Sequence, residues 1–429
     1  MNSRSSLADL LFRHGIAVFV ACAATCLAVL LSRGINLSPD GWSYWEGSVS
    51  LLNGDGYRYF GGHPIMAWPP LYSVSLAFAQ WPLGISGRTL AASLLATFLA
   101  AALALVSANR FVGRRVGHDM TSHLALTLSS AAGLAFMAQC FRGLLAETLA
   151  IAIYMFAVGL AMRLLANPVP GRKVRWLALS VLLCLLPLTK NSSLAWLPAF
   201  GVLPFVVRDA ASTTRRLARS AVLLGFPVGV WIAMRLALGQ TGSHADRTGG
   251  IGEALAINMR EAFLGFAESL GPMGIAPIGL VGLAAAVVLI GSALFSNLTR
   301  GESRGLLLWL ALNIALTAAA SAALLSLAAL PDTLRGRFIW PCVLILFIFL
   351  GVSVATMKPL LLRYLGLAVL AVAALSHWSR LGVLAMHPPA PNGLPTLTIS
   401  PTMRSGPDRP LPDGRVLVAP PTYPWTPRD

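Results

Sequence analysis

The sequence predicts an all-α polytopic membrane protein with about eleven transmembrane helices, and three observations support this fold class. First, 56% of the 429 residues are hydrophobic and only 11% are charged, whereas a soluble domain carries roughly 25% charged residues. Second, the apolar residues form blocks of about 18 to 25, which is long enough to cross ~30 Å of hydrocarbon. Third, these blocks are Leu, Ala and Val runs without alternation, which favours helices over barrel strands.

Each predicted span is an apolar block bounded by charged or turn-forming residues. The blocks lie near 14–32, 88–109, 121–140, 145–166, 175–189, 192–207, 218–238, 271–295, 304–329, 337–357 and 360–378. Basic residues cluster between alternate blocks, so placing these clusters in the cytoplasm gives one consistent topology. We therefore expect a cytoplasmic N-terminus, with most of the acidic residues on the outer side.

The net charge of +16 would favour a nucleic-acid partner in a soluble protein. Here the basic residues lie between apolar blocks and are not interleaved with aromatic residues on a polar face, so we expect no nucleic acid. No metal-ligand spacing, P-loop or Ser/His/Asp set is found. We therefore assign no metal ligands and no certain cofactor, and leave a divalent cation open.

Two expected external segments, 34–87 and 240–271, are too long to be simple turns. Long segments of this kind in compact proteins are functional or disordered. The first contains ten Trp, Tyr and Phe residues, which suits a structured layer at the lipid headgroups. The pattern from Ile251 to Leu270 indicates a helix on the membrane surface. Residues 1–380 form the expected transmembrane domain, and 381–429 form a proline-rich extracytoplasmic tail.

Within the first external segment the sequence predicts two juxtamembrane helices joined by a Gly-rich turn. Ser38 suits the N-cap and Pro39 the first position of the first helix, which would end at Asn53-Gly54. The second helix would begin near Pro69-Pro70. This arrangement puts Asp40 in a first helical turn, where a carboxylate can simply complement the helix dipole.

A second interpretation of Asp40 comes from the residues around it. The motif joins Asp40, the aromatic Tyr44 four residues later, Leu51-Leu52-Asn53-Gly54, and then Trp68-Pro69-Pro70-Leu71-Tyr72. This pattern resembles the first external loop of GT-C membrane glycosyltransferases. It is most similar to the branch with bacterial aminoarabinose, protein O-mannosyl and rhizobial lipopolysaccharide-core transferases. Gly41 and Ser73 depart from that pattern, where some branches have Glu and Pro.

The resemblance implies that Asp40 is the catalytic base and that Tyr44 and the segment from Trp68 to Tyr72 shape the site. Such enzymes take their sugar from a polyprenyl-phosphate carrier. A carboxylate would accept the proton of the attacking hydroxyl, while cations would hold the charge of the leaving phosphate.

Glu147 opens the fourth predicted span on the outer side, in the motif Arg142-Gly-Leu-Leu-Ala-Glu147-Thr148. A carboxylate at this depth can be merely interfacial. The resemblance assigns it instead to positioning of the acceptor or donor sugar, or to a metal in some branches.

Three cations on the outer side are candidates for the carrier phosphate. Lys190 lies in Leu188-Thr189-Lys190, which is similar to a family turn, although a lone lysine there can also snorkel to the interface. Arg337 lies in Arg337-Phe338-Ile339-Trp340-Pro341, which resembles the Arg-Tyr-x-x-Pro element of the family. Two arginines against the positive-inside trend suit a phosphate fork, with Arg337 as the main ligand and Arg335 in support. The alternative is pairing with Asp332 and lipid headgroups.

The expected function is transfer of a sugar from a polyprenyl-phosphate carrier to a lipid, glycan or protein acceptor, with inversion. The expected location is the bacterial cytoplasmic (inner) membrane, with the site on the extracytoplasmic face. Two alternatives are a lipid or glycan transporter or flippase and a non-catalytic assembly protein. A transporter normally has ionisable residues or broken helices at mid-membrane, whereas the charges here lie at the ends of the spans.

Overall fold

A computed structural model describes residues 7–32, 35, 39–59, 61–116, 119–165, 172–207, 211–239, 251–272, 276–295, 303–327 and 337–386. Within these ranges the ordered elements are helical, and the only β-pairing is a single bridge between Arg58 and Pro64. The predicted fold class, an all-α polytopic membrane protein, is confirmed.

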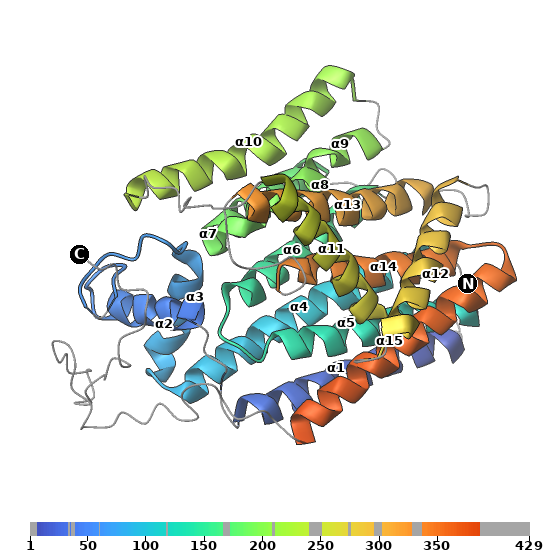
Figure 1. Cartoon of the computed structure of the whole chain (residues 1–429), viewed down its shortest axis with the longest axis horizontal. Coiled ribbons are helices and arrows are strands. Elements are labelled where there is room, and N and C mark those ends of the chain that lie inside the picture. The colour runs from blue at the N-terminus through green and yellow to red at the C-terminus, as the bar shows by residue number, and fades with distance from the viewer. Residues whose placement is uncertain are drawn as a thin grey trace.

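Most of the long helices run side by side, and the short pair α2 and α3 lies at one end of them (Figure 1). The elements are α1 (Leu7–Ser32), α2 (Pro39–Leu52), α3 (Leu71–Leu83), α4 (Gly87–Val116), α5 (Met120–Cys140), α6 (Ala146–Leu165), α7 (Arg172–Thr189), η1 (Asn191–Trp196), α8 (Pro198–Gly201), α9 (Leu203–Val206), α10 (Thr213–Ala237), α11 (Ile251–Leu270), α12 (Ala276–Phe295), α13 (Ser303–Leu327), η2 (Arg337–Ile339), α14 (Trp340–Thr356) and α15 (Leu360–Met386).

Eight helices among the described residues are long and apolar enough to cross a membrane. They are α1, α4, α5, α6, α10, α13, α14 together with η2, and α15. The expected number of about eleven is therefore not confirmed. Of the other three expected spans, α7 has three basic residues in its first turn, and the apolar stretch described in full within α12 runs only from Pro277 to Ser292.

The expected span at 192–207 is broken into η1, α8 and α9. Pro198 and Pro204 each stand at the start of one of the short α-helices. A proline has no backbone N–H and clashes with the preceding turn, so it interrupts a continuous helix. The prediction of one uninterrupted helix was wrong for this reason.

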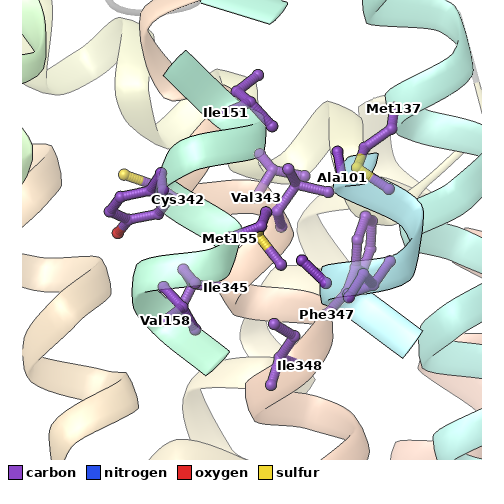
Figure 2. Packing of buried hydrophobic residues seen from close by; sticks show 14 of the residues in the cluster. Ala101, Met137, Ile151, Met155, Val158, Cys342, Val343, Ile345, Phe347 and Ile348 are labelled. Carbon is purple, nitrogen blue, oxygen red and sulfur yellow. The ribbon is translucent and has the colours of Figure 1, made fainter. Parts of the chain in front are cut away.

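Helix α14 forms the centre of the bundle, because every residue from Pro341 to Thr356 is buried. Figure 2 shows its side chains between those of α4, α5 and α6, with Ala101, Met137 and Met155 around Val343 and Phe347. Small residues permit this close approach, since a Cβ on Gly351 would lie 2.7 Å from the Cβ of Ser129.

The two predicted juxtamembrane helices are confirmed as α2 and α3. The turn after α2 contains Gly54 at φ +78°, a backbone conformation that favours glycine. Helix α3 points its polar side chains inward: Ser73 donates to the carbonyl of Tyr44 at 2.8 Å, and Gln80 donates to Ser48 at 2.8 Å. These bonds fix α3 against α2.

At the C-terminal side, α15 continues to Met386, eight residues beyond the expected end at 378. Residues 381–386 therefore belong to a helix and not to the tail, and 387–429 lie outside the described residues. The helix predicted over Ile251 to Leu270 is confirmed as α11. Its end is held by α15, because Ser376 donates to the carbonyl of Gly271 at 2.7 Å.

Candidate functional site

Asp40 stands in the first turn of α2, where the free N–H groups of a helix favour a carboxylate. Its Oδ2 accepts a hydrogen bond from Nη1 of Arg337 at 2.6 Å. Arg337 begins η2, directly before the central helix α14. The ion pair thus joins the first juxtamembrane helix to the core of the bundle across 297 positions of sequence.

Gly41 allows α2 to approach the turn that precedes α6. A Cβ at position 41 would collide with the backbone carbonyl of Leu144, three residues before Glu147. This contact gives a physical reason for glycine where some relatives in the resemblance have Glu. Glycine at position 41 is therefore required for the close packing of α2 that brings Asp40 near Glu147.

Glu147 is the most buried member of the site, with only 3% of its side chain exposed. A carboxylate this deep is costly unless it is paired. Its Oε1 accepts from Nζ of Lys190 and lies 3.1 Å from Nε of Arg337. The interfacial interpretation of Glu147 is therefore wrong, because the side chain is enclosed by protein cations.

Lys190 lies between the end of α7 and the start of η1, and it too is turned inward. Its Nζ lies 4.4 Å from the ring centroid of Phe338, and the guanidinium carbon of Arg337 lies 5.5 Å from the same centroid. An aromatic face attracts cations, so Phe338 forms a shared platform for both. The snorkelling interpretation of Lys190 does not hold.

Four segments thus meet in one cluster of two carboxylates and two cations: Asp40, Glu147, Lys190 and Arg337. Arg337 bridges both carboxylates, and the formal charges balance at two negative and two positive. The four residues that the sequence placed on one face of the membrane are therefore together at one end of the bundle.

Aromatic residues of the first external segment form a wall beside this cluster. The ring of Tyr44 lies edge-on to that of Tyr72 at 5.1 Å between centroids, and Trp68 lies 5.9 Å from Tyr44. Tyr44 and Tyr72 are both buried. The structure thus brings the three predicted aromatic residues into contact with one another on the same segment as Asp40.

The pKa of the Asp40 carboxyl is raised from its ordinary value, because burial disfavours the charged form. Arg337 opposes this shift through its charge and its hydrogen bond, while Glu147 adds to the shift and Lys190 opposes it. A carboxylate with a raised pKa is a better proton acceptor than an exposed one.

Sequence reasoning missed two residues at this site. The first is Phe338, which takes the place of Tyr in the family element; its position next to Arg337 is the sequence feature that could have marked it as part of the site. Asn191 follows Lys190 and connects two further parts of the protein: its amide donates to the carbonyl of Ala67 at 3.1 Å, and its oxygen accepts from Trp231 at 3.0 Å. Asn191 thereby fixes the segment next to Trp68. Arg335 and Asp332 lie outside the described residues.

Within the described ranges, no three or more His, Cys, Asp or Glu side chains are grouped so that they could hold a metal ion. The two carboxylates of the cluster have Arg337 between them. The metal role that the resemblance allows for Glu147 stays a prediction.

Comparison with protein-family models gives no match, and comparison with curated protein sequences gives none either. Two solved structures of ArnT from Cupriavidus metallidurans are similar in fold. The apo structure is 16% identical with a TM-score of 0.56, and the structure bound to undecaprenyl phosphate is 15% identical with a TM-score of 0.57. Each alignment covers 86% of this chain and 76% of ArnT. The chain therefore has a GT-C-like fold.

Proposed function

We propose that this protein is a membrane-embedded inverting glycosyltransferase of the GT-C type. It takes a sugar from a polyprenyl-phosphate carrier and passes it to a hydroxyl of a lipid, glycan or protein acceptor. The observation that carries this proposal is the cluster itself: a carboxylate with a raised pKa, Asp40, lies beside two cations, Arg337 and Lys190, at one end of a GT-C-like bundle.

In the proposed reaction the acceptor oxygen attacks the anomeric carbon from the side opposite the phosphate. The acceptor proton passes to the carboxylate of Asp40 as the new carbon–oxygen bond forms. The bond between the anomeric carbon and the phosphate oxygen breaks, and the carrier phosphate leaves with the electron pair. Arg337 and Lys190 stabilise the charge that develops on that phosphate.

Support for the carrier class comes from two sources. One ArnT structure of similar fold holds undecaprenyl phosphate, and the cluster offers a guanidinium and an ammonium, the usual ligands of phosphate. We place the protein in the bacterial inner membrane with this site on the extracytoplasmic side, in line with the distribution of basic residues.

The first test is transfer activity of the Asp40→Asn variant. Membranes with the protein receive a radiolabelled sugar on undecaprenyl phosphate together with candidate acceptors, and the products are separated by chromatography. Because Asn cannot take the proton, we expect the rate to fall by roughly 10²–10⁴.

Asp55→Asn is the matched control, because Asp55 lies in the same external segment but outside the cluster, in the turn after α2. It should transfer sugar at the wild-type rate. Equal rates for Asp40→Asn and wild type would overturn the role of Asp40, and no transfer by the wild-type protein with any sugar donor would overturn the function.

A further inference from the structure

The cation best placed for the carrier phosphate is also the partner of the proposed base. Nη1 of Arg337 donates to Oδ2 of Asp40 at 2.6 Å, while its Nε faces Oε1 of Glu147 at 3.1 Å. One guanidinium therefore serves both carboxylates. A hydrogen-bonded carboxylate oxygen with a cation beside it is a weaker proton acceptor, because both interactions favour its charged form.

The two halves of the cluster differ in exposure. Arg337 and Asp40 keep 24% and 17% of their side chains exposed, whereas Lys190 and Glu147 keep 11% and 3%. A ligand that enters the site therefore meets the Arg337–Asp40 pair before it meets the Lys190–Glu147 pair. The deeper contact between Nε and Glu147 can hold the guanidinium in the site while Nη1 changes its partner.

Phosphate is a strong competitor for this guanidinium. It presents several charged oxygens in a geometry that suits two parallel N–H donors, whereas Asp40 receives Nη1 through one oxygen. Lys190, which shares the Phe338 platform with Arg337, adds a second positive charge on the same side. Phosphate bound here therefore draws Arg337 away from Asp40.

We propose that Arg337 exchanges Asp40 for the carrier phosphate, so that donor binding releases the base. The base is then unmasked only when a sugar donor is in place, and the donor binds before the acceptor. After transfer, departure of the carrier phosphate lets Arg337 return to Asp40. This inference rests on the proposed function for the carrier class and for the role of Asp40 as base.

The charged and titratable groups around Asp40 come from several elements. Arg337 from η2 and Lys190 after α7 attract its negative charge, and Glu147 from α6 repels it. Tyr44 from α2 itself and Tyr59 in the turn region also interact with it. Of these groups, Arg337 is the one whose hydrogen bond Asp40 accepts, so its movement changes the basicity of Asp40 most.

A double-mutant cycle on undecaprenyl phosphate binding tests the exchange without any turnover. The four proteins are wild type, Asp40→Asn, Arg337→Gln and the double variant, each titrated calorimetrically in detergent micelles. Asp40→Asn removes the competitor for Arg337, so we expect it to tighten binding about tenfold or more, as close charge pairs couple by such factors. In the Arg337→Gln background the same change should alter the Kd less than about twofold.

The cycle separates exchange from simple repulsion, because loss of one negative charge would tighten binding equally in both backgrounds. Equal effects, weaker binding by Asp40→Asn, or no binding by the wild type would each overturn the proposal. Asp119→Asn is the control for substitution of a paired carboxylate. Asp119 caps the N-terminus of α5 and pairs with Arg363 at 2.7 Å. The Kd of Asp119→Asn for undecaprenyl phosphate should therefore equal that of the wild type. A positive cycle with no sugar transfer would leave the exchange standing and refute the proposed function.

Discussion

The carboxylate of Asp40 is subject to two opposing influences. Burial raises its pKa, and the guanidinium of Arg337 lowers it. The net pKa is above the ordinary value of about 3.9 for aspartate. A base must be ionised to accept a proton, so activity should be present above this raised pKa and lost as the pH falls through it.

The pH dependence of kcat/KM for the donor therefore has a predictable direction. The profile of kcat/KM reports ionisation in the free enzyme. Because the pKa of Asp40 is raised there, the acidic limb should lie at higher pH than for an ordinary aspartate. Arg337→Gln removes the cation that lowers the pKa of Asp40 most, so the acidic limb of the variant's residual activity should move to still higher pH. A limb that stays in place or moves down in Arg337→Gln would contradict the assignment of Asp40.

Gly41 gives a second residue-level prediction. Gly41→Ala should reduce sugar transfer by about tenfold or more, since a displacement of about 1 Å at a reacting group can cost far more. The added Cβ collides with the carbonyl of Leu144 and pushes α2 away from Glu147. Gly159→Ala, inside α6 with open space around the Cβ position, should retain full activity. Initial rates and thermal unfolding of both variants provide the comparison.

The site residues that could be predicted from the sequence are charged residues at places where a membrane protein normally has none of that charge. Lys190 and Arg337 are cations on the predicted outer side, and Glu147 is a carboxylate at a membrane boundary, so each needed an explanation. Phe338 and Asn191 are uncharged, so this criterion does not mark them as site residues. The contact of Gly41 with Leu144 joins positions about a hundred apart in the chain, and no local pattern contains that information.

At the level of single elements, α3 differs from a surface helix of a soluble protein. It carries no charged residue, one face buries Ser73 and Gln80 together with Tyr72 and Leu76, and the opposite face exposes large apolar side chains. Phe78 and Trp81 keep 74% and 77% of their side chains exposed. This arrangement suits a helix whose outer face lies in the membrane interface.

We therefore predict that Trp81 is in contact with lipid. Lipids brominated near the headgroup should quench part of the tryptophan fluorescence, and Trp81→Phe should lower that quenched fraction. Trp45→Phe is the matched control, because Trp45 in α2 is fully buried and its loss should leave the quenched fraction at least as high. Equal loss in both variants would place α3 away from the bilayer.

The elements were predicted best where capping and turn residues mark their ends. Pro39 and Gly54 bracket α2, and the helical pattern from Ile251 to Leu270 coincides with α11. The apolar composition of 192–207 predicts one span, but Pro198 and Pro204 divide the region into short helices. Helix α15 is longer than the predicted span because its polar residues Ser376 and Arg380 are bonded to the end of α11, a contact that the apolar pattern does not contain.

For the whole molecule, the fold class followed from composition, but the number of spans did not. Helix α7 is apolar over most of its length, but three basic residues in its first turn leave it outside the spans defined by length and composition. Its place in the bilayer depends on the neighbours that it packs against, and a one-dimensional pattern does not contain that packing.

The orientation of the whole molecule makes a direct prediction. Cysteine introduced at Asn53, exposed after α2, should react with an impermeant maleimide in intact cells, in a background where exposed Cys22 is replaced by Ser. Cysteine at Arg114, exposed at the end of α4, should react only after the membrane is permeabilised. The opposite pattern would put the site in the cytoplasm and refute the proposed location.

The bond between Asp40 and Arg337 also has a consequence for biosynthesis. The ribosome reaches Arg337 only 297 residues after Asp40, which takes roughly 15 to 60 s at about 5–20 residues per second. During that interval the nascent chain contains Asp40 but not yet its partner Arg337 or helix α14. Under the proposed function, a chain that stops before Arg337 lacks one of the two cations for the carrier phosphate, so insertion of α14 into the membrane completes the site.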